Sequence, residues 1–126
     1  RVAVVFGLAC FVACLPACGR KGDAGRPRLG IVTNCADPFW DLCAAGANQA
    51  GKDFNAEVVF RQPNELDTGV QMPIINELVN SPEGLGGLRV SVIHPKAQPE
   101  QLKRIGDKLP LVTMDNDAPD SGRLCY

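Results

Sequence analysis

The sequence contains a single histidine, His94, and this scarcity removes the most common catalytic and metal-binding arrangements. A Ser-His-Asp or Cys-His set needs a histidine beside its nucleophile, and no such partner can be assigned to His94, which we expect in a surface loop. The six cysteines form no CxxC pair and no Cys/His cluster, so a structural zinc site is not expected. The sequence therefore predicts neither an enzyme nor a metal protein.

An excess of charge of either sign is also lacking. The 13 Lys and Arg residues against 14 Asp and Glu leave a net charge of −1, without the basic surface that nucleic acid requires. GLGGL at 84–88 precedes an apolar run instead of following one, so it is no dinucleotide-binding fingerprint. In DNDAPD, Pro119 stands where a calcium loop needs a ligand. We predict no cofactor and no nucleic-acid partner.

A long uncharged run is present only at the amino end, over residues 2–17. Its length is typical of a signal-peptide core and short for a membrane span. It ends in LPACG at 15–19, which resembles a bacterial lipoprotein box with Cys18 as the lipidated residue. We predict a signal peptide over 1–17, then the lipidated Cys18 and a flexible tether through residue 28, which place the protein outside the cytoplasm on a membrane. The alternative, a buried apolar helix, is disfavoured by the polar run GRKGDAGRPR.

Both ends of the sequence, Arg1 and the final RLCY, read as truncations. Three cysteines remain beyond the predicted anchor: Cys35, Cys43 and Cys125. An odd number in an oxidising compartment leaves at least one thiol unpaired. We expect buried free thiols, with a Cys35–Cys43 or a Cys35–Cys125 bridge as the alternatives.

From residue 29 onward, short apolar runs alternate with stretches of helical periodicity. We expect strands at 29–33, 56–61, 88–93 and 111–114, and helices at about 38–54, 67–80 and 99–108. The connections are too short for antiparallel meanders, so the order predicts parallel strands with right-handed crossovers. The predicted fold class is α/β, a doubly wound parallel sheet with helices on both faces.

The first two predicted helices carry signals about their ends and their packing. Asp37 suits the N-cap of the first helix, and the small residues 45–47 are expected to let this helix approach the sheet closely. In the second helix, Pro73 implies either a start near residue 70 or a kink. The first helix also carries an apolar stripe at a spacing of four, formed by Leu42, Gly46, Ala50 and Phe54.

Ligands of such sheets bind beyond the carboxyl ends of the strands, and two of the loops expected there are rich in polar groups. They are NCADPFW after the first strand and MDNDAPDSG after the fourth. Asp37 and Asp115 supply carboxylates that accept hydroxyl hydrogen bonds, and Phe39 and Trp40 supply rings that cover the C–H faces of a sugar. A sugar site is therefore indicated. The alternatives are a helix cap for Asp37, core packing for the aromatic residues and a solvated turn at 115–117.

Three segments together resemble a known family. DPFW at 37–40 resembles the motif after the first strand of periplasmic sugar-binding proteins of the ribose/galactose type, which serve ABC transporters. LRVSVIHP at 88–95 and VTMDND at 112–117 are similar to the third and fourth strands of that family. The resemblance covers residues 29–126. It implies the incomplete N-terminal lobe of a two-lobed protein, the type 1 periplasmic binding protein.

The resemblance also implies roles for particular residues. Asp37, Asp115 and Asn116 would bond sugar hydroxyls, while Phe39 and Trp40 would pack on the sugar ring. Asn116 stands where ribose receptors commonly have Arg, which removes a planar donor fork and argues against ribose as the ligand.

The implied function is an extracytoplasmic receptor that closes around a monosaccharide by a hinge motion and delivers it to ABC permease subunits. One alternative is a sugar-sensing receptor for a membrane kinase. Another is the ligand-binding domain of a repressor with the same fold. The lipoprotein-like leader occupies the place of a repressor's DNA-binding domain, which favours export.

Overall fold

The computed structural model describes residues 25–126, so the predicted signal peptide (1–17), Cys18 and most of the tether lie outside the described residues. Within residues 25–126 no helix has the length and apolar character needed to cross a membrane. The strands and helices alternate as predicted, although the first strand begins at Arg28, inside the stretch assigned to the tether. The elements are β1 (Arg28–Val32), α1 (Pro38–Asp53), β2 (Glu57–Arg61), α2 (Thr68–Val79), β3 (Gly87–Val90), α3 (Pro99–Gly106), β4 (Leu111–Thr113) and the 3-10 helix η1 (Pro119–Ser121).

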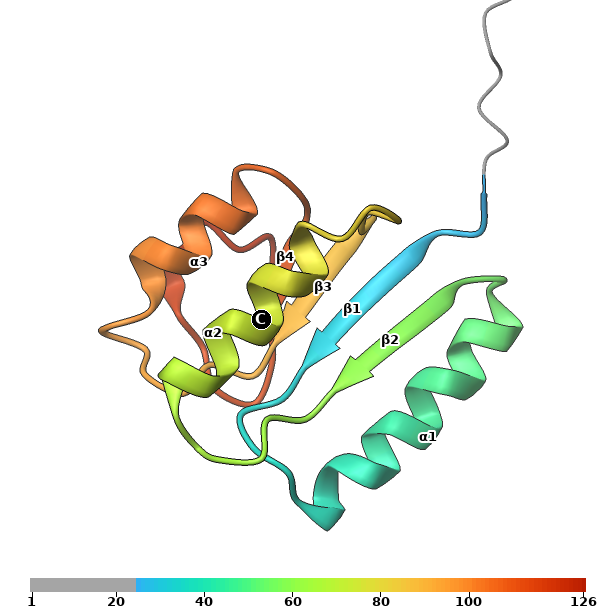
Figure 1. Cartoon of the computed structure of the whole chain (residues 1–126), viewed down its shortest axis with the longest axis horizontal. Coiled ribbons are helices and arrows are strands. Elements are labelled where there is room, and N and C mark those ends of the chain that lie inside the picture. The colour runs from blue at the N-terminus through green and yellow to red at the C-terminus, as the bar shows by residue number, and fades with distance from the viewer. Residues whose placement is uncertain (1–24) are drawn as a thin grey trace, which may run out of the picture.

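The four strands form one parallel sheet in the order β2-β1-β3-β4, which confirms the predicted fold class (Figure 1). The chain passes from β1 to β2 on one side and then crosses to β3 on the other. The strand order therefore reverses between β1 and β3. In open α/β sheets, this switch point is where the carboxyl ends of the strands leave a crevice for a ligand.

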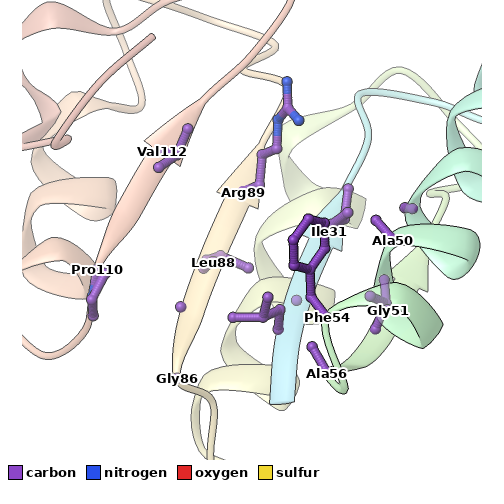
Figure 2. Close-up of a pocket in the computed structure, with 15 residues that line it drawn as sticks. Ile31, Ala50, Gly51, Phe54, Ala56, Gly86, Leu88, Arg89, Pro110 and Val112 are labelled. Atoms are coloured by element: carbon purple, nitrogen blue, oxygen red, sulfur yellow. The ribbon is translucent and has the colours of Figure 1, made fainter. Parts of the chain in front are cut away.

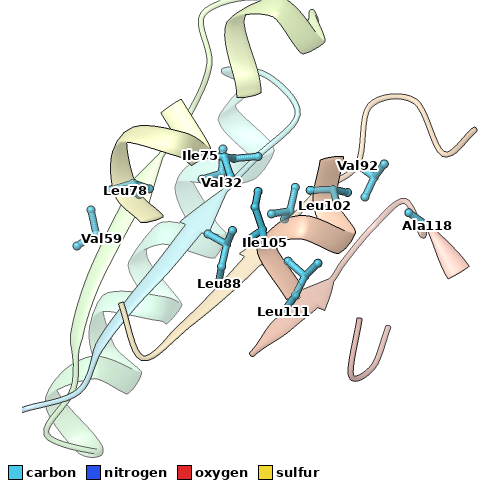
Figure 3. Close-up of a cluster of buried hydrophobic side chains, with 11 residues drawn as sticks. Val32, Val59, Ile75, Leu78, Leu88, Val92, Leu102, Ile105, Leu111 and Ala118 are labelled. Atoms are coloured by element: carbon cyan, nitrogen blue, oxygen red, sulfur yellow. The ribbon is translucent and has the colours of Figure 1, made fainter. Parts of the chain in front are cut away.

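Alternation along the strands sends successive side chains to opposite faces of the sheet. Val59 of β2 belongs to a buried cluster with residues of α2 and α3, whereas the preceding Val58 faces α1. Helices thus cover both faces, as predicted. Figure 3 shows the buried cluster, which consists of Val32, Val59, Ile75, Leu78, Leu88, Val90, Val92, Leu102, Ile105, Leu111 and Ala118.

The helix starts follow from acidic caps. Oδ1 of Asp37 accepts the backbone N–H of Phe39 at 2.8 Å, so the predicted N-cap of α1 is confirmed. Asp67 caps α2 in the same way, and the helix begins at Thr68. The start near residue 70 is therefore wrong, and Pro73 lies in the helix interior. Proline has no N–H to donate, so α2 lacks one of its internal hydrogen bonds there.

The packing of α1 differs from the prediction. Its apolar stripe is exposed, with Leu42 at 79% and Phe54 at 80% of their full accessibility. The close approach to the sheet occurs at Gly51, because a Cβ there would lie 2.9 Å from the carbonyl oxygen of Ala56. Around Gly46 there is open space, so this residue does not provide the close approach expected of the small residues 45–47.

Beside α1, the same face of the sheet carries an apolar groove of about 590 Å³ (Figure 2). Its lining includes Ile31, Phe54 and Val112, and the charged side chain among the lining residues is Arg89. The groove reaches the amino ends of the strands, where Pro110 lines it. It lacks the convergent polar groups of a sugar site, and its lining does not include Asn34, Ser91 or Asp115.

Candidate ligand site at the carboxyl ends of the strands

Three polar side chains meet where β1, β3 and β4 end. Asn34 follows β1, Ser91 follows β3 and Asp115 comes shortly after β4. Oδ2 of Asp115 accepts a hydrogen bond from Oγ of Ser91 at 2.9 Å and a longer one from Nδ2 of Asn34 at 3.4 Å. Because β1 and β3 flank the switch point, these three residues mark the crevice where a ligand is expected. We call them the Asn34–Ser91–Asp115 cluster.

Asp115 is held by a tight turn. Its φ of 63° lies in the left-handed region, which Asp tolerates better than most residues with a side chain. The N–H of Asn116 donates to the Met114 carbonyl at 2.7 Å, and the Tyr126 hydroxyl donates to the Asp115 carbonyl at 2.9 Å. Strained backbone of this kind is common where a side chain must be presented to a ligand.

Asp115 retains capacity for further hydrogen bonds. Within residues 25–126, both hydrogen bonds to its carboxylate are made to Oδ2. The side chain is exposed, so Oδ1 can accept donors from outside the described residues. An ionised carboxylate accepts at both oxygens, and its bonds to hydroxyl groups are charge-assisted.

Asn34 connects the cluster to the two aromatic residues. Its Oδ1 accepts Nε1–H of Trp40 at 3.0 Å and the thiol of Cys35 at 3.5 Å. Trp40 is only 5% exposed, whereas Phe39 is 63% exposed and packs edge-on against the indole with ring centroids 4.9 Å apart. Phe39 thus offers the open aromatic surface. Trp40, expected to be a ligand wall, lies behind it and orients Asn34.

The other predicted site residues border this cluster. Asp37 uses Oδ1 for the helix cap, which leaves Oδ2 at an exposed position. Asn116 is exposed next to Asp115. Within the described residues, neither side chain forms a hydrogen bond to the cluster. The structure therefore joins Asp115 to Trp40 through Asn34 and leaves Asp37, Phe39 and Asn116 open around them.

Asp117, two residues after Asp115, has a structural role. It accepts hydrogen bonds from the Thr113 hydroxyl at 2.7 Å and the Ala118 N–H at 2.8 Å, and it pairs with the Arg123 guanidinium through both oxygens. The bonds from Arg123 are the main reason that the pKa of Asp117 falls from its ordinary value of 3.8 to about 2. Asp117 thereby closes the loop that carries Asp115.

Solved proteins have a fold similar to that of this chain, although no family model matches it. An ABC transporter solute-binding protein from Burkholderia graminis, crystallised with D-arabinose, shares 28% identity and a TM-score of 0.72 over 80% of this chain and 35% of its own. The chain is similar to sugar-binding proteins of ABC transporters.

Two further solved proteins have a similar fold. XylFII matches with 25% identity and a TM-score of 0.72, over 80% of this chain and 37% of its own, and it is also known in a complex with LytSN. AraP, an arabinose-binding protein from Geobacillus stearothermophilus, matches at 21% identity and a TM-score of 0.68, covering 80% and 34%. The chain thus spans about a third of the length of these proteins and forms part of one lobe of the periplasmic binding protein fold.

Sequence reasoning did not identify two members of the cluster, Asn34 and Ser91. Asn34 is the first polar residue after a predicted strand, which is the same signal that singled out Asp115. Ser91 was placed inside the predicted strand 88–93, but β3 ends at Val90. A shorter third strand would have put Ser91 at the carboxyl edge of the sheet with the others.

The thiols of the described part are free. Cys35 and Cys43 are half-buried, but Cys125 is exposed, so the prediction of buried thiols is wrong for Cys125. His94 is exposed, as predicted. Within residues 25–126 no group of three His, Cys, Asp or Glu side chains is placed to hold a metal ion.

Proposed function

We propose that this chain is part of a receptor outside the cytoplasm that binds a monosaccharide reversibly and delivers it to an ABC transporter. The observation that carries the proposal is the convergence of Asn34, Ser91 and Asp115 at the switch point of the sheet. Similarity to a solute-binding protein with bound D-arabinose supports a sugar as the ligand.

Different residues bind the hydroxyl groups of the sugar and the face of its ring. Oδ1 of Asp115, the free oxygen of Asp37 and the amide of Asn116 bond sugar hydroxyls. The exposed Phe39 ring covers the C–H face of the sugar, and Trp40 holds Asn34 in place. Binding requires no covalent step, and two lobes close around the sugar by a hinge motion.

The proposal includes attachment to a membrane. The apolar run 2–17 and the LPACG string at 15–19 support a signal peptide and a lipid on Cys18. Metabolic labelling with a lipid analogue checks this, and labelling that persists in Cys18→Ala contradicts it.

Calorimetry of the full-length protein against a panel of pentoses and hexoses tests sugar binding. For the sugar that binds, we expect Phe39→Ala to weaken affinity about tenfold, or about 1.4 kcal/mol. Phe54→Ala is the matched control, because this second exposed Phe lines the groove outside the site. Tight binding of another ligand class with no binding of any sugar would reject the proposal.

A sensing role is the second candidate, and the XylFII–LytSN complex favours it. In that role the sugar-bound receptor contacts a membrane kinase instead of permease subunits. Purified permease subunits and a purified kinase from the same gene neighbourhood are compared in sugar-dependent binding to the receptor. Binding to the permease alone supports transport, and binding to the kinase alone supports sensing.

A further inference from the structure

Two glutamines are buried directly behind the candidate site. Gln71 of α2 is 0% exposed and Gln98, just before α3, is 1% exposed. Nε2 of Gln71 donates to the backbone carbonyl of Thr33 at 2.9 Å and to that of Ser91 at 2.7 Å. One side chain thus bonds the chain leaving β1 and the chain leaving β3.

Gln98 extends this arrangement to the loop after β3. Its Oε1 accepts the backbone N–H groups of Ile93 and His94, both at 2.8 Å, and its Nε2 donates to Oε1 of Gln71 at 2.8 Å. Both ends of this row are backbone groups of fixed polarity, so the orientation of both amides is determined. Every amide oxygen and nitrogen in the row has a partner, as buried polar groups require.

The row lies where the ladder between the two strands ends. β1 and β3 pair up to Val32 and Val90, after which the Ser91 N–H still reaches the Val32 carbonyl. Beyond that point, the side chain of Gln71 bonds the next backbone carbonyl of each chain, those of Thr33 and Ser91. The two strands are therefore tied together at the switch point by a side chain instead of by each other.

The residues that Gln71 ties down are those that carry the site. Thr33 is followed directly by Asn34, and the Ser91 hydroxyl donates to the Asp115 carboxylate. A shift of either backbone changes the separation of Asn34 and Ser91, and both bond the same oxygen of Asp115.

We propose that Gln71, supported by Gln98, is a positioning residue that sets the spacing of the Asn34–Ser91–Asp115 cluster for ligand binding. This inference rests on the proposed function for its link to sugar affinity. Its competitor is a purely structural role, in which the glutamines only satisfy buried backbone groups. The two roles predict different results for a variant that still folds. A positioning role changes its affinity for sugar, whereas a purely structural role does not.

The main variant is Gln71→Met in the full-length protein, with Gln101→Met, an exposed Gln of α3, as the matched control. Sugar affinity is measured by calorimetry well below the unfolding temperature, with the folded fraction checked by circular dichroism. We expect Gln71→Met to weaken affinity about tenfold and Gln101→Met to leave it unchanged. A structural role lowers the unfolding temperature but leaves the affinity of the folded protein intact.

A second readout does not depend on any sugar. The indole N–H of Trp40 bonds to Asn34, so its NMR resonance reports the position of that side chain. With the resonance assigned through Trp40→Phe, we expect it to shift in Gln71→Met and to stay in place in Gln101→Met. Should the full-length protein bind no sugar, the proposed function fails, but this shift still decides whether Gln71 positions Asn34.

A second variant covers the case in which Gln71→Met does not fold. Gln98→Met removes the donor to Gln71 and leaves the bonds from Gln71 to the Thr33 and Ser91 carbonyls in place. We expect a loss of affinity of about threefold and a smaller shift of the Trp40 resonance. An unchanged affinity together with an unchanged resonance, in whichever of the two variants folds, overturns the inference.

Discussion

Removing only the charge of Asp115 tests the central residue of the site. Asp115→Asn keeps the size of the side chain and an oxygen that can accept the Ser91 hydroxyl, which lies 2.9 Å away in the structure. Asn also tolerates the left-handed backbone at φ 63°. We therefore expect the free energy of unfolding to change by less than about 0.5 kcal/mol.

The expected effect on sugar binding is larger. A hydrogen bond to a charged group contributes about 1.5–3 kcal/mol, against about 0.5–1.5 kcal/mol between neutral groups. Oδ1 of Asp115 is the atom proposed to accept a sugar hydroxyl, so losing the charge removes roughly 1.4 kcal/mol. This corresponds to an affinity about tenfold weaker.

Calorimetry with the bound sugar and urea unfolding of the same samples measure the two quantities. Asp120→Asn is the control, because it removes the same charge from an exposed position in η1. Asp115→Gly separates the backbone from the carboxylate, since glycine adopts the left-handed region freely but bonds no hydroxyl. If Asp115→Asn binds the sugar as tightly as the parent protein, the carboxylate does not contact the ligand and the reasoning fails.

Two further predictions concern stability. The lowered pKa of Asp117, about 2, means that its bonds to Arg123 stabilise the fold fully above the ordinary pKa of 3.8 and are lost as the pH falls through 2. Denaturation measured across this range should show the advantage of the parent over Asp117→Asn shrinking towards pH 2, and a constant difference would contradict it. Leu102→Ala empties a fully buried position and should cost about 2–5 kcal/mol, whereas Leu66→Ala, at a residue 63% exposed, should cost less than about 0.5 kcal/mol in the same urea titration.

The sequence signals that predicted the fold correctly are local ones. The apolar runs mark four strands, and Asp37 before Pro38 marks the start of α1. The parallel order follows from the short connections. These features depend on residues near each other along the chain, which a single sequence contains in full.

The details that failed depend on distant neighbours. The third strand was predicted to reach residue 93, but it ends at Val90, and Gln71 of α2 takes the Ser91 carbonyl beyond it. The apolar residues of α1 do recur at a spacing of four along the helix. This spacing does not indicate whether another surface covers them, and Leu42 is exposed.

The site shows the same limit. Asp115 and Phe39 could be selected from their places after strands, since that selection uses only order along the chain. The burial of Trp40 could not, because order along the chain does not tell whether an aromatic residue after a strand faces a ligand or turns its indole N–H to Asn34, as Trp40 does. Asn34 itself was recognised as part of a polar loop but not as the residue that bonds both Trp40 and Asp115.

The buried glutamine row also has a consequence for how this protein can change through evolution. The amide of Gln71 accepts from Gln98 and donates to two backbone carbonyls. The amide of Gln98 donates to Gln71 and accepts from two backbone N–H groups. No single substitution at either position preserves every bond. The two positions should therefore covary among related proteins. The joint identity of residues 71 and 98 can then serve as a marker of shared ancestry in a search for relatives of this protein.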